Sequence, residues 1–195
     1  MTYQWILFCL IGYLLGAIPT GHIITRLLTG INIYEFGSSH TGATNVKRAA
    51  GLKAAVATAI LDVLWGTASV LIAHMITDNL WIAAGAGAAA IIGHNWSIYI
   101  RFKGGIGLST LFGSLVYFQP LTVTGSALIL VVLRQILVKG MRLHRARVTI
   151  FGMILFPFVL WLLGLPREGI LLCIPGVLVV ILKTIPDWNR KYKKT

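Results

Sequence analysis

The chain has 195 residues, of which 57% are hydrophobic and only 11% are charged, whereas an ordinary soluble domain carries about 25% charged residues. Lys and Arg outnumber Asp and Glu by 17 to 5, which leaves a formal net charge of +12. These figures exclude an ordinary soluble domain and a disordered chain. With a mean hydropathy of +0.84, they predict a single membrane-embedded domain over residues 1–195.

Seven apolar segments follow one another along the chain and predict an all-α integral membrane protein with seven transmembrane helices. Six segments are interpreted as full spans, and a shorter one, residues 107–118, as a half-length or tilted span. The first segment has no basic residue before it and ends at Arg26, so we expect it to be retained as a span. The six full spans are residues 4–28, 54–77, 81–100, 121–138, 148–163 and 168–182.

The basic residues predict the orientation of these spans, because cytoplasmic loops carry an excess of Lys and Arg. With the N-terminus outside and the C-terminus in the cytoplasm, the inner connections contain every basic residue except Arg167. These inner connections are residues 26–53, 101–106, 134–147 and 183–195. The net charge is therefore explained by topology, and we expect no nucleic-acid partner.

The first inner loop contains a candidate anion site. Residues 37–45 (GSSHTGATN) place hydroxyl and amide side chains between glycines, and Lys47 and Arg48 follow. Glycines let backbone amides converge on a phosphate, and hydroxyls with nearby cations complete such a site. The same composition is also typical of a polar turn that caps the next helix, with Ser38 or Thr44 as the N-cap residue.

The second inner loop has a related pattern in residues 103–107 (KGGIG), although its spacing is not that of a Walker A loop. Three glycines beside Lys103 and ahead of a helix favour an anion site. A re-entrant turn with a snorkelling lysine is the alternative. His94, near the inner end of its span, is interpreted either as a hydrogen-bonded structural residue or as a catalytic base.

Asp62 lies deep in the second span, where a carboxylate is costly unless it is paired or functional. We expect either an ion pair with Arg48, Lys103 or Arg101 from a neighbouring loop or a direct role in substrate binding. No spacing of His, Cys, Asp and Glu indicates a metal site. No nucleotide or other cofactor motif is present, so neither metal nor cofactor is expected.

These motifs together resemble the PlsY family of bacterial membrane acyltransferases. Residues 37–45 match its G-S-G-N-x-G-A-T-N, and residues 93–94 with 102–110 match its G-H followed by F-K-G-G-K-G-x-A-T. Residues 16–21 (GAIPTG) are similar to its G-S-I-P-F-G, and residues 62–66 (DVLWG) to its D-x-x-K-G. The resemblance extends along the whole chain in order and spacing.

The resemblance implies a seven-helix fold in the bacterial inner membrane, with the active site on the cytoplasmic face. It implies transfer of an acyl group from acyl phosphate to glycerol 3-phosphate, giving lysophosphatidic acid and phosphate, without an obligate protein partner. Ser38, Asn45 and His94 are the implied catalytic residues, and Asp62 supports the site. The implied phosphate-binding residues are Gly37, Thr44, Arg48, Lys103, Gly104 and Gly105.

Four positions depart from the family pattern. Its lysines in D-x-x-K-G and F-K-G-G-K-G are replaced by Trp65 and Ile106, and two of its asparagines by His40 and Asp187.

Two expected phosphate-binding cations are thus missing. We predict that Arg145 or Arg147 takes over such a role, the alternative being charge that orients the helices and faces lipid headgroups. An altered paralogue that binds a lipid or a phosphometabolite is the second candidate function, and a small transporter the third.

Overall fold

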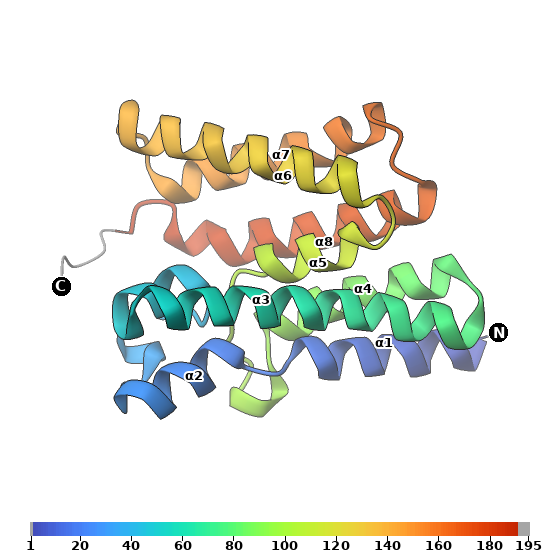
Figure 1. The fold of residues 1–195 in the computed structure, drawn as a ribbon, viewed down its shortest axis with the longest axis horizontal. Coiled ribbons are helices and arrows are strands. Elements are labelled where there is room, and N and C mark those ends of the chain that lie inside the picture. The colour runs from blue at the N-terminus through green and yellow to red at the C-terminus, as the bar shows by residue number, and fades with distance from the viewer. Residues whose placement is uncertain (1, 191–195) are drawn as a thin grey trace.

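The computed structural model describes residues 2–190 and is all-helical over that range, apart from one isolated bridge between Ser97 and Lys103 (Figure 1). Lys191, Lys193 and Lys194, which we assigned to the inner face, lie outside the described residues. The α-helices are α1 (Thr2–Gly16), α2 (Thr20–Thr29), α3 (Ala43–Thr77), α4 (Leu80–Asn95), α5 (Leu108–Val116), α6 (Pro120–Gln135), α7 (Arg145–Leu162) and α8 (Arg167–Thr184). Shorter helical turns are η1 (Ile33–Glu35), η2 (Ile98–Ile100), η3 (Ile136–Gly140) and η4 (Ile185–Asp187).

Five helical segments of the described chain are long and apolar enough to cross a membrane: Thr2–Thr29, Ala43–Thr77, Pro120–Gly140, Arg145–Leu162 and Arg167–Asp187. The helix α4 is apolar but has only 16 residues, which span about 24 Å at 1.5 Å per residue. The helix α5 has nine residues. These lengths agree with the predicted integral membrane fold, whereas the count of seven spans stays a prediction.

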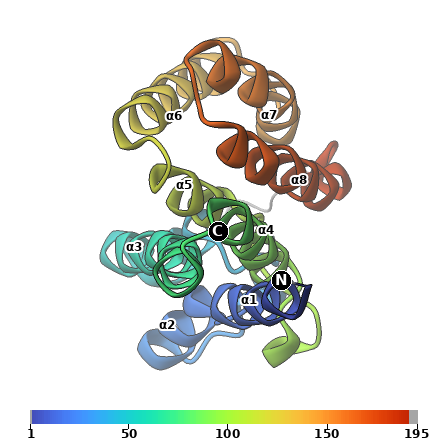
Figure 2. The same ribbon diagram turned by 90° about the vertical axis from the view of Figure 1, so that its right-hand side faces the viewer.

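The helices lie side by side, with α4 at the centre of the first five (Figure 2). It packs against α1, α3, α5 and α8. Its buried face is made of small residues such as Ala83, Ala86 and Ala90. At the α1 interface, a Cβ on Gly16 would overlap the backbone of Ala90. Small residues let two membrane helices approach closely. The backbones of α1 and α4 therefore pack against each other without bulky side chains between them.

The predicted first span is broken into α1 and α2 at residues 17–19. Pro19 ends α1 because its ring has no N–H and disfavours a helical conformation in the residue before it. Thr20 then begins α2 and lies buried. A second break occurs at Gly51 in α3, whose φ of 84° is left-handed. Gly42 precedes α3 without a side-chain cap, so neither Ser38 nor Thr44 is its N-cap residue.

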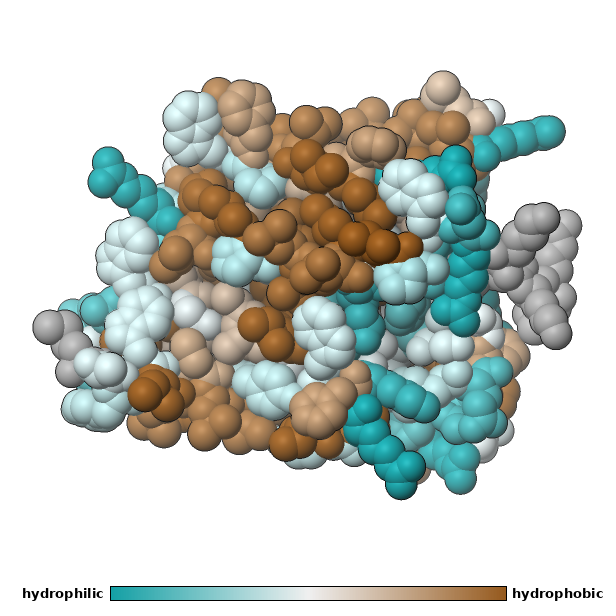
Figure 3. All heavy atoms as spheres, turned by 180° about the vertical axis from the view of Figure 1, so that it is seen from behind, coloured by the Kyte–Doolittle hydropathy of each residue, from teal (hydrophilic) through white to brown (hydrophobic). Residues whose placement is uncertain are grey.

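One end of the molecule is polar. The α2–α3 loop, the α6–α7 loop and the end of α8 gather there, while the N-terminal end of α1 lies at the opposite end (Figure 1). Seen from behind, brown apolar side chains cover the middle of the molecule, and hydrophilic side chains gather towards the polar end (Figure 3). The fold therefore brings the loops with the predicted functional motifs together.

Candidate active site

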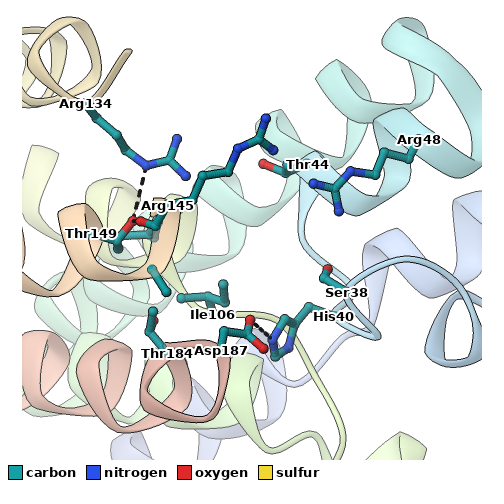
Figure 4. Close-up of a pocket in the computed structure, with 12 residues that line it drawn as sticks. Ser38, His40, Thr44, Arg48, Ile106, Arg134, Arg145, Thr149, Thr184 and Asp187 are labelled. Carbon is teal, nitrogen blue, oxygen red and sulfur yellow. Dashed lines mark hydrogen bonds and ion pairs between the residues drawn. The ribbon is translucent and has the colours of Figure 1, made fainter. Parts of the chain in front are cut away.

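A pocket of about 90 Å³ opens at the polar end, where the first inner loop meets α3, α6, α7 and the end of α8 (Figure 4). A single water needs only about 10–15 Å³ of such space, so the pocket has room for a phosphate-sized group. It is lined by Ser38, His40, Thr44, Arg48, Ile106, Leu108, Arg134, Arg145, Ala146, Thr149, Thr184 and Asp187.

The wall formed by residues 37–45 is folded around the side chain of Asn45. Its Oδ1 accepts the amide of Ser38 at 3.1 Å, and its Nδ2 donates to the carbonyls of Phe36 and His40 at 2.9 and 3.0 Å. Gly37 has a left-handed φ of 56°, and any Cβ on it would overlap Asn45 Oδ1. Asn45 is only 1% exposed. The structure therefore makes Asn45 the organiser of this loop, and the catalytic role that we predicted for it stays a prediction.

The end of α8 is tied to the same loop. Arg190 donates from Nη1 to the carbonyl of Ser38 at 2.9 Å and to Asp187 Oδ1 at 3.2 Å, and from Nη2 to Ser39 Oγ at 3.2 Å. The other oxygen of Asp187 lies 2.9 Å from His40 Nε2. Two positions that depart from the family pattern, His40 and Asp187, are thus in direct contact across 147 residues of sequence.

Three arginines from three helices line the pocket, Arg48 on the side of Ser38 and Thr44, and Arg134 and Arg145 on the opposite side (Figure 4). Arg48 comes from α3, Arg134 from the end of α6 and Arg145 from the start of α7. Arg134 donates from Nε to Thr149 Oγ1 at 3.2 Å, which fixes its direction. The wall has three cations facing one carboxylate, Asp187, and guanidinium groups suit bidentate contacts to phosphate.

Sequence reasoning missed Arg134, which we counted only as topological charge. The sequence did contain a signal for it: Arg134 lies at the predicted inner end of a span, and only a short loop separates it from Arg145.

Arg147 and Lys103 do not line the pocket. Arg147 donates to Asn189 Oδ1 at 2.6 Å, and its guanidinium lies 5.3 Å from the Trp188 ring centre. Of the two arginines proposed to replace a lysine, only Arg145 therefore faces the pocket. The exposed ammonium of Lys103 lies 5.3 Å from the centre of the Tyr34 ring, and its phosphate-binding role stays a prediction.

Asp62 has different partners from the loop cations that we expected. Its Oδ1 accepts from Thr20 Oγ1 at 2.7 Å and lies 3.8 Å from His94 Nδ1. Thr20 reaches it because the break at Pro19 places the start of α2 beside α3. Asp62 and His94 are both buried and neither lines the pocket, and the roles that we predicted for them stay predictions.

The two glycines of the second loop lie directly against His94. The amide of Gly105 donates to the His94 carbonyl at 3.0 Å, and a Cβ at this position would overlap His94 Nε2. The carbonyl of Gly104 accepts the amide of Thr41 at 3.4 Å, which joins the two loops. The Gly105 amide therefore already has a partner within the protein, and the anion contacts that we predicted for Gly104 and Gly105 stay predictions.

The two residues that replace the lysines of the family pattern lie in different places. Ile106 places an apolar side chain in the pocket wall. Trp65 stands outside it, and its buried Nε1 has no hydrogen-bond partner among the described residues. Within residues 2–190, no group of three His, Cys, Asp or Glu side chains has the arrangement of a metal site.

Fold and pocket together describe a helical protein with apolar helices long enough to span a membrane and an arginine-lined pocket at its polar end. Sequence comparison identifies the family, since the family described as glycerol-3-phosphate acyltransferase matches residues 6–194. The chain belongs to this family, which confirms the resemblance found in its motifs.

Individual relatives agree with this assignment. The chain is 32% identical to glycerol-3-phosphate acyltransferase 1 of Dehalococcoides mccartyi, over 93% of this chain and 88% of that protein. The glycerol 3-phosphate form of PlsY, an integral membrane glycerol 3-phosphate acyltransferase, superposes with a TM-score of 0.80 at 29% identity, over 95% of this chain and 90% of the other. The lysophosphatidic acid form superposes with 0.78 at 28% identity, with the same coverage. The protein is a membrane acyltransferase, and the transporter and binding-paralogue alternatives are not favoured.

Proposed function

We propose that this protein transfers an acyl group from acyl phosphate to a hydroxyl of glycerol 3-phosphate, giving lysophosphatidic acid and inorganic phosphate. The observation that carries the proposal is the pocket, in which Arg48 and Arg145 face Ser38 and Thr44. Solved structures similar to this chain are of a glycerol 3-phosphate form and a lysophosphatidic acid form. Both substrates of the proposed reaction carry phosphate, which matches the excess of cations in the wall.

The arginines are proposed to replace the two lysines that the family pattern leads one to expect. A hydrogen bond to a charged group contributes about 1.5–3 kcal/mol, so the loss of two without replacement would weaken phosphate binding by orders of magnitude. Arg145 and Arg134 supply two cations on the wall opposite Ser38. The pocket therefore keeps its charge although Ile106, in its wall, is neutral.

An acyl phosphate is already an activated donor, so its transfer requires charge stabilisation more than a covalent nucleophile. In the proposed complex, Arg48 and Arg145 hold the phosphates, and the Ser38 hydroxyl orients the acyl carbonyl or the acceptor. Asn45, Gly37 and Arg190 keep that loop in shape. His94 and Asp62 support the Gly104–Gly105 turn from below, and Lys103 remains a proposed cation outside the pocket wall.

We propose seven crossings, with the N-terminus outside and the C-terminus and pocket on the cytoplasmic side of the bacterial inner membrane. The opposite ends at which α1 begins and α8 finishes support an odd number of crossings (Figure 1). The excess of basic residues in the connections assigned to the cytoplasmic side supports the orientation. In this arrangement α4, α5 and their connections complete crossings for which these helices alone are short.

The purified protein in detergent, supplied with palmitoyl phosphate and glycerol 3-phosphate, tests the donor and the acceptor together. We expect phosphate release and lysophosphatidic acid in equal amounts, with a large loss of both in Ser38→Ala. Palmitoyl-coenzyme A in place of palmitoyl phosphate is the donor control. Product from the thioester but not from the phosphate would refute the proposed donor.

A further inference from the structure

His40 and Asp187 form a partly buried hydrogen-bonded pair on the wall of the pocket, beside Ser38 (Figure 4). His40 Nε2 lies 2.9 Å from Asp187 Oδ2, and the two side chains are 14% and 2% exposed. The second oxygen of the same carboxylate, Oδ1, accepts from Arg190 Nη1 at 3.2 Å. The imidazole is thus held in one orientation by a carboxylate that is itself held by a guanidinium.

This geometry fixes which ring nitrogen carries the proton. An ionised carboxylate only accepts hydrogen bonds, so His40 Nε2 must donate and therefore carries the hydrogen. In the neutral ring, Nδ1 is then the nitrogen with a lone pair. The arrangement provides a proton acceptor on the pocket wall, held in a defined tautomer as in other His–Asp pairs.

Burial, together with the cations around the pair, favours the neutral form of the His40 ring. Burial lowers the pKa of His40 below its ordinary value of 6.5, and Asp187 opposes that effect. The cations Lys183 and Arg190, on the same side as Asp187, lower it further. Arg48, Arg134 and Arg145 face the ring from the other walls of the pocket. A base must be unprotonated to act, and this environment favours that state.

We propose that His40 Nδ1 is the general base of the acyl transfer and that Asp187 is its positioning residue. The inference rests on the proposed function. The acceptor oxygen of glycerol 3-phosphate forms a bond to the acyl carbon, and its proton passes to Nδ1. The bond between that carbon and the phosphate oxygen breaks with its electron pair, and the imidazolium returns the proton to the departing phosphate, which leaves as hydrogen phosphate.

His94 is the other histidine that we considered as a base, and its position does not suit that role. It does not line the pocket, its Nδ1 faces Asp62, and Gly105 packs directly against its Nε2. An asparagine, which the family pattern has at the position of His40, accepts no proton at neutral pH. The His40–Asp187 pair therefore gives this chain a group for proton transfer that the family pattern lacks.

Two variants distinguish a catalytic role of His40 from a purely structural role of its hydrogen bond to Asp187. In His40→Gln the side-chain amide reaches the position of Nε2 and still donates to Asp187, but there is no base. In Asp187→Asn the amide oxygen accepts from Arg190, which can only donate, and the amide NH₂ turns to His40. That NH₂ requires Nε2 as its acceptor and moves the ring proton to Nδ1, so the tether is kept and the base is lost.

The assay measures steady-state phosphate release from palmitoyl phosphate and glycerol 3-phosphate between pH 5 and 9. General bases typically contribute about 10²–10⁴-fold to rate, so we expect kcat to fall at least about 100-fold in both variants, with KM for glycerol 3-phosphate nearly unchanged. The acid limb of the wild-type kcat profile, with an apparent pKa below 6.5, is expected to disappear in His40→Gln. His74→Gln is the matched control, because His74 bonds Tyr117 at the other end of α3.

The wild-type rate tests the donor, and the ratio of variant to wild-type kcat tests the base, so the two proposals fail separately. A wild-type kcat and a persistent acid limb in His40→Gln would show that His40 is only a tether. A wild-type kcat in Asp187→Asn would overturn the assigned tautomer. Thermal unfolding of each variant, expected to stay close to that of the wild type, separates loss of the base from loss of the fold.

Discussion

The replacement of lysines by arginines in the pocket is tested most directly at Arg145. The change Arg145→Ala removes a guanidinium from the wall and leaves Arg48 and Arg134 in place. Because Arg145 is exposed, we take the lower end of the range for a charged hydrogen bond, about 1.5 kcal/mol. At 1.4 kcal/mol per factor of ten, KM for a phosphorylated substrate is expected to rise about 10-fold.

The assay is phosphate release at varied glycerol 3-phosphate and then at varied palmitoyl phosphate, which identifies the substrate that Arg145 contacts. Arg142→Gln is the matched control, since Arg142 is an exposed arginine close in sequence that does not line the pocket. We expect the effect of Arg145→Ala to shrink as salt is raised, because an exposed charge is screened over about 10 Å at 0.1 M. Unchanged KM for both substrates would refute the phosphate role and leave Arg145 as topological charge.

Three further changes follow from the contacts of the site. Gly105→Ala inserts a methyl group against His94, which is expected to cost about 1–3 kcal/mol and lower Tm by about 2–12 °C, whereas Gly125→Ala, with open space around its Cβ, is expected to leave Tm unchanged or raise it. Ile106→Lys returns a cation to the pocket wall and is expected to lower KM for a phosphorylated substrate up to about 10-fold, with Ile106→Met as the size control; an increase would contradict this. Burial lowers the pKa of His40, so below pH 6.5 the unfolded chain binds more protons than the folded chain, and folded-state stability is lost as the pH falls. The decrease in Tm from pH 7.5 to pH 5.5 is therefore expected to be smaller in His40→Gln than in the wild type.

The sequence predicted the helices well because apolar length and the distribution of basic residues are local properties of a membrane chain. It also placed the two motif loops together, and the structure joins them through the amide of Thr41 and the carbonyl of Gly104. The break between α1 and α2 was not predicted, although Pro19 is a local signal for it. The span 107–118 was recognised as short, and α5 is indeed only nine residues long.

The partners inside the site were harder to predict, because a contact between distant residues leaves no local pattern. The cations considered for Asp62 came from the nearest basic loops, yet its partners are Thr20 and His94. Asn45 is part of a motif associated with the active site, and a motif does not distinguish a residue that binds substrate from one that folds the loop around it. Such a distinction requires the hydrogen bonds.

His40 and Asp187 both depart from the family pattern, and the departures are explained only when the two residues are considered as a pair. Taken separately, each replaces a neutral amide with a titratable group and casts doubt on the site. In contact, the carboxylate bonds the partly buried imidazole and sets its tautomer, while Arg190 balances the charge of the carboxylate. The cations follow the same logic, because Arg134 and Arg145 approach from α6 and α7 the pocket in which Ile106 replaces a lysine. The pocket thus retains a net positive charge but draws it from helices at the far side of the bundle, which makes phosphate binding depend on how α6 and α7 pack against the loops of the N-terminal half.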